Sequence, residues 1–163
     1  MKPFESLIFT PAALGPLYLL AVAYPLGRID VRERRLPNRL VLPAFPVTLL
    51  GQLLAWQPQR ITQALLVAVV AFGAGLLANR AGSLGMGDVK LIAAIALALG
   101  WFSPFAVLVA VSLSFGFGVL AIAIIALRQK KEMGRSIALG PYLLVGFASA
   151  VGFLAWPAPV LTL

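Results

Sequence analysis

The chain contains no cysteine and no histidine. The missing cysteine excludes disulfides, zinc–thiolate sites and thiol nucleophiles. The missing histidine excludes serine–histidine hydrolysis, HExxH zinc peptidases and histidine proton relays. Acidic residues are scarce as well, because only five of the 163 residues are Asp or Glu, and Asp30 and Asp88 are the two aspartates. Acid–base chemistry therefore depends on very few positions.

Charged residues of either sign are infrequent, and long apolar runs take their place. The chain is 61% apolar and 11% charged, with a mean hydropathy of +1.00, whereas soluble domains are about half apolar and about one quarter charged. The composition therefore indicates a membrane protein. Uncharged runs occupy residues 6–27, 40–59, 61–79, 91–127 and 136–163.

A helix needs about 20 apolar residues to cross the hydrocarbon core of a bilayer. Four of the five runs hold one crossing each, and the run 91–127 is long enough for two, with the turn residues Gly100-Trp-Phe-Ser-Pro104 near its middle. We therefore expect a single all-α transmembrane domain over residues 1–163. Its six expected spans are 10–27, 40–56, 61–78, 89–101, 104–127 and 137–156.

Proline and tryptophan residues predict details of these spans. Pro43 and Pro46 predict an irregular start of the second span. Trp56, Trp101 and Trp156 fall near outer ends, as interfacial aromatic residues do. The amino-terminal residues lack the basic region and the small-residue cleavage site of a removable signal peptide, so we expect the first run to remain as a permanent span.

The distribution of positive charge predicts the orientation in the membrane. Eleven of the thirteen Lys and Arg residues lie in the segments 28–39, 80–90 and 128–135. With six spans, these segments form the first, third and fifth connections, which share one side. By the positive-inside rule that side is cytoplasmic, so both termini lie on the non-cytoplasmic side. The net charge of +8 is then an orientation signal that touches anionic lipid headgroups, and we expect the lipid bilayer, not nucleic acid, as the partner.

Both aspartates are expected at this cytoplasmic face. Asp30 follows the first apolar run, and Asp88 lies in the glycine-rich stretch 81–90, just before the fourth span. Two carboxyls held close together cannot easily both ionise, so one keeps a proton while the other stays charged. Such a pair performs general acid–base hydrolysis: the carboxylate takes a proton from water, and the acid protonates the carbonyl oxygen of the attacked peptide.

Other residues near the aspartates suit such a site. Gly85 and Gly87 can adopt positive φ and let a substrate backbone approach Asp88. Asp88 is expected at the start of a helix, where the macrodipole favours the ionised carboxylate. Asn38 is well placed to cap the second span, and Gly140-Pro141 is expected to break or delay the helix of the sixth.

Each candidate also has a purely structural interpretation. Asp88 can cap the fourth span, and Asp30 can pair with the arginines beside it in a solvated loop. Lys90 can be an interfacial cation that extends its ammonium group to the lipid headgroups. Glu33 and Glu132 are most simply solvated loop acids. Periodicity does not decide between these interpretations.

Three ordered segments resemble one family of membrane enzymes. Gly85-Met-Gly-Asp88 fits the GxGD motif of membrane aspartyl peptidases, and its extension to Leu91 resembles the version found in type IV prepilin peptidases. Upstream, Asp30 followed by Arg34-Arg35-Leu-Pro-Asn38 is similar to the first aspartate segment of that family. Downstream, Leu139-Gly-Pro-Tyr-Leu143 resembles its Gly-Pro-aromatic segment. A lone GxGD recurs by chance, but three such segments in order across residues 27–145 make the resemblance specific.

The resemblance implies an aspartyl endopeptidase of the cytoplasmic (inner) membrane. It would cleave the short basic leader from prepilin or pseudopilin precursors at the cytoplasmic face, after a glycine or similar small residue, without a metal or other cofactor. Larger members carry a segment with paired cysteines and also methylate the new amino terminus; this chain lacks cysteine, so we expect no methyltransferase activity. Asp30 and Asp88 would be the catalytic dyad, and the residues expected to shape the site or bind substrate are Pro37, Asn38, Gly85, Gly87, Lys90, Gly140 and Pro141.

The short form looks most like the peptidases of tight-adherence pilus systems, while archaeal preflagellin peptidases and processors of type II secretion pseudopilins remain alternatives. Outside the family, the alternative function is a small cation or proton transporter in which Asp30 and Asp88 bind the ion. A non-catalytic component of a secretion machine is the third hypothesis. Both acids lie at one face, and only scattered polar residues lie within the spans, which favours a surface site over a transport path. The oligomeric state is left open.

Overall fold

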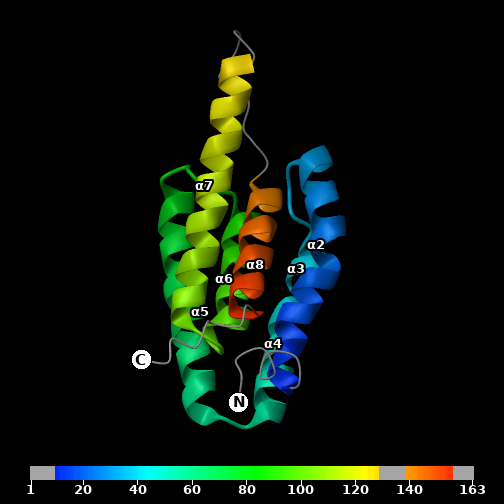
Figure 1. Cartoon of the computed structure of the whole chain (residues 1–163), viewed down its shortest axis with the longest axis vertical. Coiled ribbons are helices and arrows are strands. Elements are labelled where there is room, and N and C mark those ends of the chain that lie inside the picture. Colours follow the sequence, from blue (N-terminus) through cyan, green and yellow to red (C-terminus); the bar gives the residue numbers. More distant parts are fainter. Residues whose placement is uncertain (1–9, 129–138, 156–163) are drawn as a thin grey trace, which may run out of the picture.

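The computed structural model describes residues 10–128 and 139–155, and these residues are all-helical, as the sequence predicts. The expected start and end of the sixth span, and Trp156, lie outside the described residues. The elements, drawn in Figure 1, are the short 3-10 helix η1 (Pro11–Ala13), α2 (Leu14–Glu33), α3 (Asn38–Val41), α4 (Ala44–Ala55), α5 (Pro58–Arg80), α6 (Met86–Gly100), α7 (Pro104–Arg128) and α8 (Gly140–Ala155).

The second span is broken near its start, as its prolines predict. The helix α3 has only four residues, and Leu42 and Pro43 separate it from α4. A proline has no N–H group to donate, so the helical ladder is interrupted where Pro43 occurs. Helical hydrogen bonding resumes where the N–H groups of Phe45 and Val47 donate to the carbonyls of Leu42 and Pro43, at 3.2 and 3.1 Å.

Among the residues that the structure describes, four helical segments are long and apolar enough to cross a membrane: Pro11–Glu33, Asn38–Ala55, Pro58–Arg80 and Pro104–Ile124. The helices α6 and α8 are shorter, with 15 and 16 residues. At 1.5 Å per residue α6 is only about 23 Å long, less than the roughly 30 Å of a hydrocarbon core. Its neighbours surround it, so it need not meet the lipid itself.

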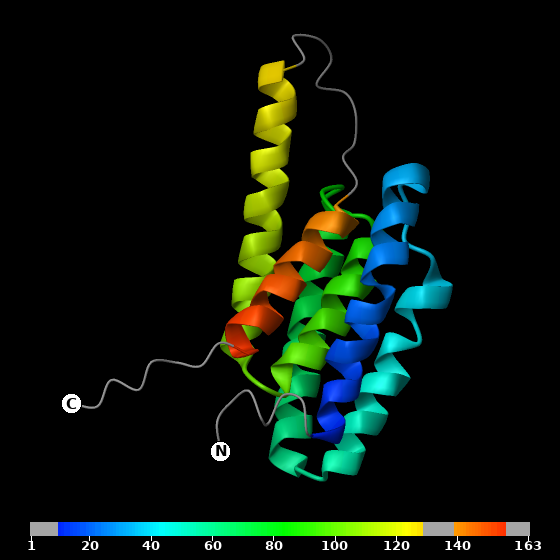
Figure 2. The ribbon, with the colours of Figure 1, turned by 45° about the vertical axis from the view of Figure 1, so that its right-hand side comes forward.

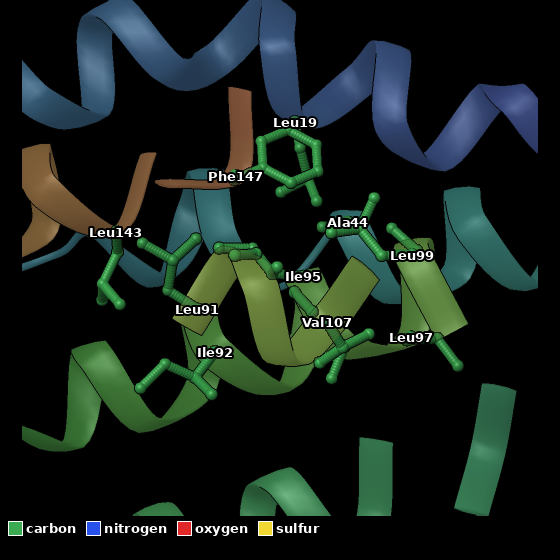
Figure 3. Packing of buried hydrophobic residues seen from close by; sticks show 14 of the residues in the cluster. Leu19, Ala44, Leu91, Ile92, Ile95, Leu97, Leu99, Val107, Leu143 and Phe147 are labelled. Carbon is green, nitrogen blue, oxygen red and sulfur yellow. The ribbon is translucent and has the colours of Figure 1, made fainter. Parts of the chain in front are cut away.

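The helix α6 forms the centre of the bundle. Every residue from Leu91 to Gly100 is buried, and α2, α4, α5, α7 and α8 all contact it. A helix that is apolar on all sides is expected in such a position. Figure 3 shows Leu91 and Ile95 of this helix among side chains of α2 and α8, including the fully buried Leu19 and Phe147.

Two glutamines connect the outer helices to α6. The Nε2 of Gln52 in α4 donates to the carbonyl of Leu97 at 2.8 Å, and the Nε2 of Gln63 in α5 donates to that of Gly100 at 2.7 Å. Next to Gly100, Trp101 is 2% exposed and packs inside the bundle, whereas Trp56 is 76% exposed. The position of either ring at the membrane interface stays a prediction. These two buried or partly buried glutamines thus join α4 and α5 to α6.

One end of the bundle collects the basic segments. The helices α2, α5 and α7 end there, and α6 and α8 begin there (Figures 1 and 2). The expected first and third connections, with their arginines and Lys90, therefore meet at a single end, which we call the basic end. Assignment of the basic end to the cytoplasm rests on the charge distribution and stays a prediction.

Candidate active site

Asp30 lies within a helix and faces the interior. The sequence places it in the loop after the first span, but α2 continues through Glu33 and ends at Arg34, whose φ of 53° is left-handed. The side chain of Asp30 is only 4% exposed, on the same face of α2 as the buried Leu19 and Leu26. Among the described residues, no arginine forms an ion pair with Asp30. The interpretation of Asp30 as a solvated loop acid is therefore wrong.

The start of α8 supplies a partner for Asp30. The backbone N–H of Gly140 donates to Oδ2 of Asp30 at 2.9 Å. The first N–H groups of a helix have no partner within the helix, and the macrodipole adds positive potential there. This contact favours the carboxylate form of Asp30 and acts against the burial of the side chain, which favours the protonated form.

Only glycine fits at position 140. A Cβ atom there would lie 2.6 Å from Oδ2 and 3.0 Å from Cγ of Asp30. Gly140 thus does more than begin a helix, because it lets the backbone of α8 approach the carboxyl group closely. The helix indeed begins at Gly140, as the Gly-Pro pair predicts.

Asp88 lies in the first turn of α6, whose N-cap is Gly85 in extended conformation. The side chain is half-buried, and a Cβ atom on Gly85 would lie 3.0 Å from Oδ2 of Asp88. Burial and, to a smaller extent, the nearby Asp30 carboxyl together raise the pKa of Asp88 to about 6, against the effect of a hydrogen bond with the Gly85 backbone, which lowers it. Asp88 therefore both bonds the Gly85 backbone at the start of α6 and interacts electrostatically with Asp30.

The two aspartates therefore interact across three helix ends. The end of α2 carries Asp30, the start of α6 carries Asp88, and the start of α8 donates to Asp30. Charges on neighbouring carboxyls oppose each other, which is the physical cause of the contribution of Asp30 to the pKa of Asp88. At mildly acidic pH, below about 6, Asp88 can therefore keep its proton beside Asp30.

Leu36 is a part of this site that the sequence analysis missed. It lies between α2 and α3 and is 8% exposed. A Cβ atom on Gly87 would lie 3.1 Å from its Cβ atom, and one on Gly140 would lie 3.1 Å from its Cδ2 atom. Leu36 thus fills the space between the starts of α6 and α8. Its one signal in the sequence is that it is the only large apolar residue in the charged segment 32–39.

The glycines of the GxGD stretch matter because they leave room for neighbouring side chains, not because of an unusual backbone conformation. Among the described glycines, positive φ occurs at Gly82. Gly85 is extended, with φ of −71°, and Gly87 lies inside α6. The prediction that Gly85 and Gly87 adopt positive φ is therefore wrong. Their lack of a side chain instead leaves room for Asp88 and Leu36.

Lys90 and Asn38 contact each other across α6 and α3. The Nζ of Lys90 donates to Oδ1 of Asn38 at 3.1 Å. The N-cap of α3 is Pro37, which is extended, and no side chain caps this helix. The prediction that Asn38 caps the second span is therefore wrong, and its side-chain oxygen accepts from Lys90 instead. This contact ties α3 to the helix that carries Asp88.

Sequence comparison then identifies the family. The model of the type IV leader peptidase family matches residues 17–127, a range that includes Asp30 and Asp88. The chain belongs to this family. It is also 32% identical, over 159 aligned residues, to the prepilin leader peptidase/N-methyltransferase of Escherichia coli (strain K12), an alignment that covers 91% of this chain and 67% of the relative. No solved structure matches the chain.

As a member of the type IV leader peptidase family, the chain is a prepilin peptidase of the aspartyl protease type with transmembrane helices. Glu33 forms an exposed ion pair with Arg35 at 3.5 Å, Pro141 borders a groove between α2 and α8, and Glu132 lies outside the described residues. Within residues 10–128 and 139–155, no three acidic, His or Cys side chains cluster as a metal site would require.

Proposed function

We propose that this member of the type IV leader peptidase family is an aspartyl endopeptidase that removes the basic leader of prepilin-like precursors. Asp30 and Asp88 form its catalytic dyad, and the reaction takes place at the cytoplasmic face of the membrane. The observation that carries the proposal is the unlike setting of two interacting carboxyls. Asp30 accepts a hydrogen bond from Gly140, and Asp88 is half-buried with a pKa of about 6.

In this mechanism Asp30 is the base and Asp88 the acid. The Asp30 carboxylate takes a proton from a water molecule, whose oxygen attacks the carbonyl carbon of the scissile peptide, while Asp88 gives its proton to the carbonyl oxygen. The C–N bond of the resulting tetrahedral diol then breaks. The leaving amine receives the proton held by Asp30, and Asp88 recovers a proton from a hydroxyl of the diol. No residue beyond the dyad has to titrate.

The remaining candidates position the dyad. Gly85, Gly87 and Gly140 leave the space that the carboxyls and Leu36 occupy. Lys90 and Asn38, next to Pro37, hold α3 against α6. Their substitution should affect kcat through the distance between the carboxyls, because a misplacement of about 1 Å can lower a rate about 100-fold.

We further propose that the enzyme does not methylate its product. The support is the absence of cysteine, since the methylating members that the chain resembles carry paired cysteines. Mass spectrometry of a pilin processed in the presence of S-adenosylmethionine tests this directly. A free amino terminus is expected, and an added methyl group would refute the proposal.

A transporter has less support. A transport path needs polar groups along the bundle that are free to bind an ion. The amide nitrogens of Gln52 and Gln63 instead donate to carbonyls of α6, and Ser114 donates to the carbonyl of Ala110 at 2.6 Å. Among the described residues, Oε1 of Gln52 is one buried acceptor without a partner, and a single such oxygen does not make a path. Both aspartates lie at the basic end of the bundle, where α2 ends and α6 begins.

A cleavage assay in membranes tests the proposed function. Candidate precursors are incubated with the wild-type protein and with Asp30→Asn and Asp88→Asn variants, which keep the side-chain shape but lose the acid–base function. Glu33→Gln is the matched control, because Glu33 is an exposed acid on the same helix as Asp30. We expect a shortened pilin from wild type and from the control, and none from either aspartate variant. Cleavage by an aspartate variant would refute the dyad, and cation flux lost in both variants without any cleavage would favour a transporter.

A further inference from the structure

A groove of about 520 Å³ runs along the outside of the bundle between α2 and α8. Both helices pack against each other on their inner faces, and α8 lies beside α2 in Figures 1 and 2. The groove is the space left on their outer flank. Its apolar wall consists of Ala23, Gly27 and Val31 from α2 and Leu144, Val145 and Ala148 from α8.

Two arginines line the same groove at the basic end. Arg28 and Arg32 are both exposed and lie four residues apart on one face of α2, with Tyr24 one turn before them. Among the described residues, no acidic side chain lies within ion-pair distance of either guanidinium. Asp30 points to the interior instead, and Glu33 contacts Arg35. The apolar groove thus ends at Arg28 and Arg32, and no acidic side chain of the described residues neutralises these two charges.

We propose that this groove is a binding site for one anionic glycerophospholipid. An acyl chain lies along the apolar wall, and the lipid phosphate accepts hydrogen bonds from Arg28 and Arg32. Guanidinium groups suit this contact because their planar fork binds phosphate oxygens in pairs. From Ala23 to Arg32 the wall extends about 14 Å at 1.5 Å per residue, about half of a bilayer core of roughly 30 Å. The two arginines occupy the last part of this length, so the groove holds the phosphate and the adjoining part of one acyl chain.

The position of the groove connects the lipid to the site. Its wall at the basic end includes Pro141, which directly follows Gly140, and Gly140 donates to Asp30 of α2. A lipid in the groove contacts both helices whose ends make this hydrogen bond. Its binding should therefore stabilise the folded bundle, whether or not the protein is a peptidase.

Native mass spectrometry of the full chain in detergent tests the site, with phosphatidylglycerol and phosphatidylcholine as probes. The test variant is Arg28→Gln/Arg32→Gln, and Arg39→Gln/Arg80→Gln is a control that removes the same charge from exposed positions outside the groove. At about 1 kcal/mol per arginine near a lipid surface, the test variant should bind phosphatidylglycerol about 30-fold more weakly. The control should lose less affinity than the test variant, because Arg39 and Arg80 do not line the groove.

Two further arms make the outcome specific. Ala148→Phe fills the apolar wall without changing charge, so it should lower retention of both lipids. Inorganic phosphate should not displace phosphatidylglycerol, because the acyl chain contributes to binding. Equal losses in the test and control variants, or unchanged binding in the test variant, would overturn the proposal. Unchanged lipid binding together with a raised KM for precursor would assign the groove to the substrate instead.

Discussion

Gly140→Ala is the substitution that tests the proposed site most directly. The new Cβ atom would lie 2.6 Å from Oδ2 of Asp30, whereas ordinary contacts of a Cβ atom begin near 3.4 Å. The carboxyl group or the start of α8 must therefore move by about 0.8 Å, the difference between these two distances. A misplacement of this size costs about 100-fold in rate. We expect kcat to fall by about two orders of magnitude, with KM nearly unchanged.

The matched control is Gly152→Ala on the same helix, where a Cβ atom would meet nothing within 4 Å. Alanine is a better helix former than glycine, so this control should raise the free energy of unfolding by about 0.5–1 kcal/mol and leave cleavage unchanged. If Gly140 served only to start a helix, its alanine variant would behave like the control. The two hypotheses therefore predict opposite results.

The assay is single-turnover cleavage of a precursor by wild type and both variants in the same vesicles, with thermal unfolding measured in parallel. A well-folded Gly140→Ala protein with wild-type kcat would refute the reasoning, because Asp30 would then tolerate displacement. Loss of rate in Gly152→Ala would equally show that the effect is not specific to the site.

Two further predictions concern Asp88 and its surroundings. Because its pKa is raised from 3.8 to about 6, protonation stabilises the folded state fully below pH 3.8, and this contribution is lost as pH rises through 6. The difference corresponds to at most about 3 kcal/mol, which solvent screening of a half-buried group reduces. Asp88→Asn should therefore unfold at higher temperature than wild type at pH 8 but not at pH 4, and equal pH dependence in the two proteins would contradict this. Gly87→Ala should slow cleavage by displacing Leu36, whereas Gly116→Ala, with nothing within 4 Å, should not; equal rates would contradict it.

The helical architecture could be predicted from the sequence because it follows from hydropathy and proline alone. The apolar runs indicated six helical passes, and Pro43 indicated the break between α3 and α4. The end of the first helix could not be predicted in this way. Charged residues from Arg28 onward end the apolar run, yet the helix continues to Glu33, because Leu26 and Asp30 continue its inward face. Hydropathy averages over all faces and does not detect that continuity.

The site was predictable by residue type but not by contact. The GxGD stretch and Asp30 were evident as the few acidic positions near span ends. By contrast, the pairing of Lys90 with Asn38 and the position of Leu36 depend on how α3 approaches α6. Local sequence assigned Asn38 to a cap and Gly87 to a position with positive φ, since those are common local uses of asparagine and glycine. Tertiary contacts determined both.

The proposed chemistry requires two carboxyls that differ, and the fold makes them differ. Asp30 is nearly inaccessible, which disfavours its charged form, while the N–H of Gly140 donates to it and favours that form. Asp88 is only half-buried at the start of α6, so it can exchange protons with water. A dyad built on a single helix would give both carboxyls similar surroundings. Here the end of α2 meets the starts of α6 and α8, so Asp30 is next to Gly140 and Asp88 is next to Gly85. The buried centre of α6 holds the start of that helix, and therefore Asp88, in this position.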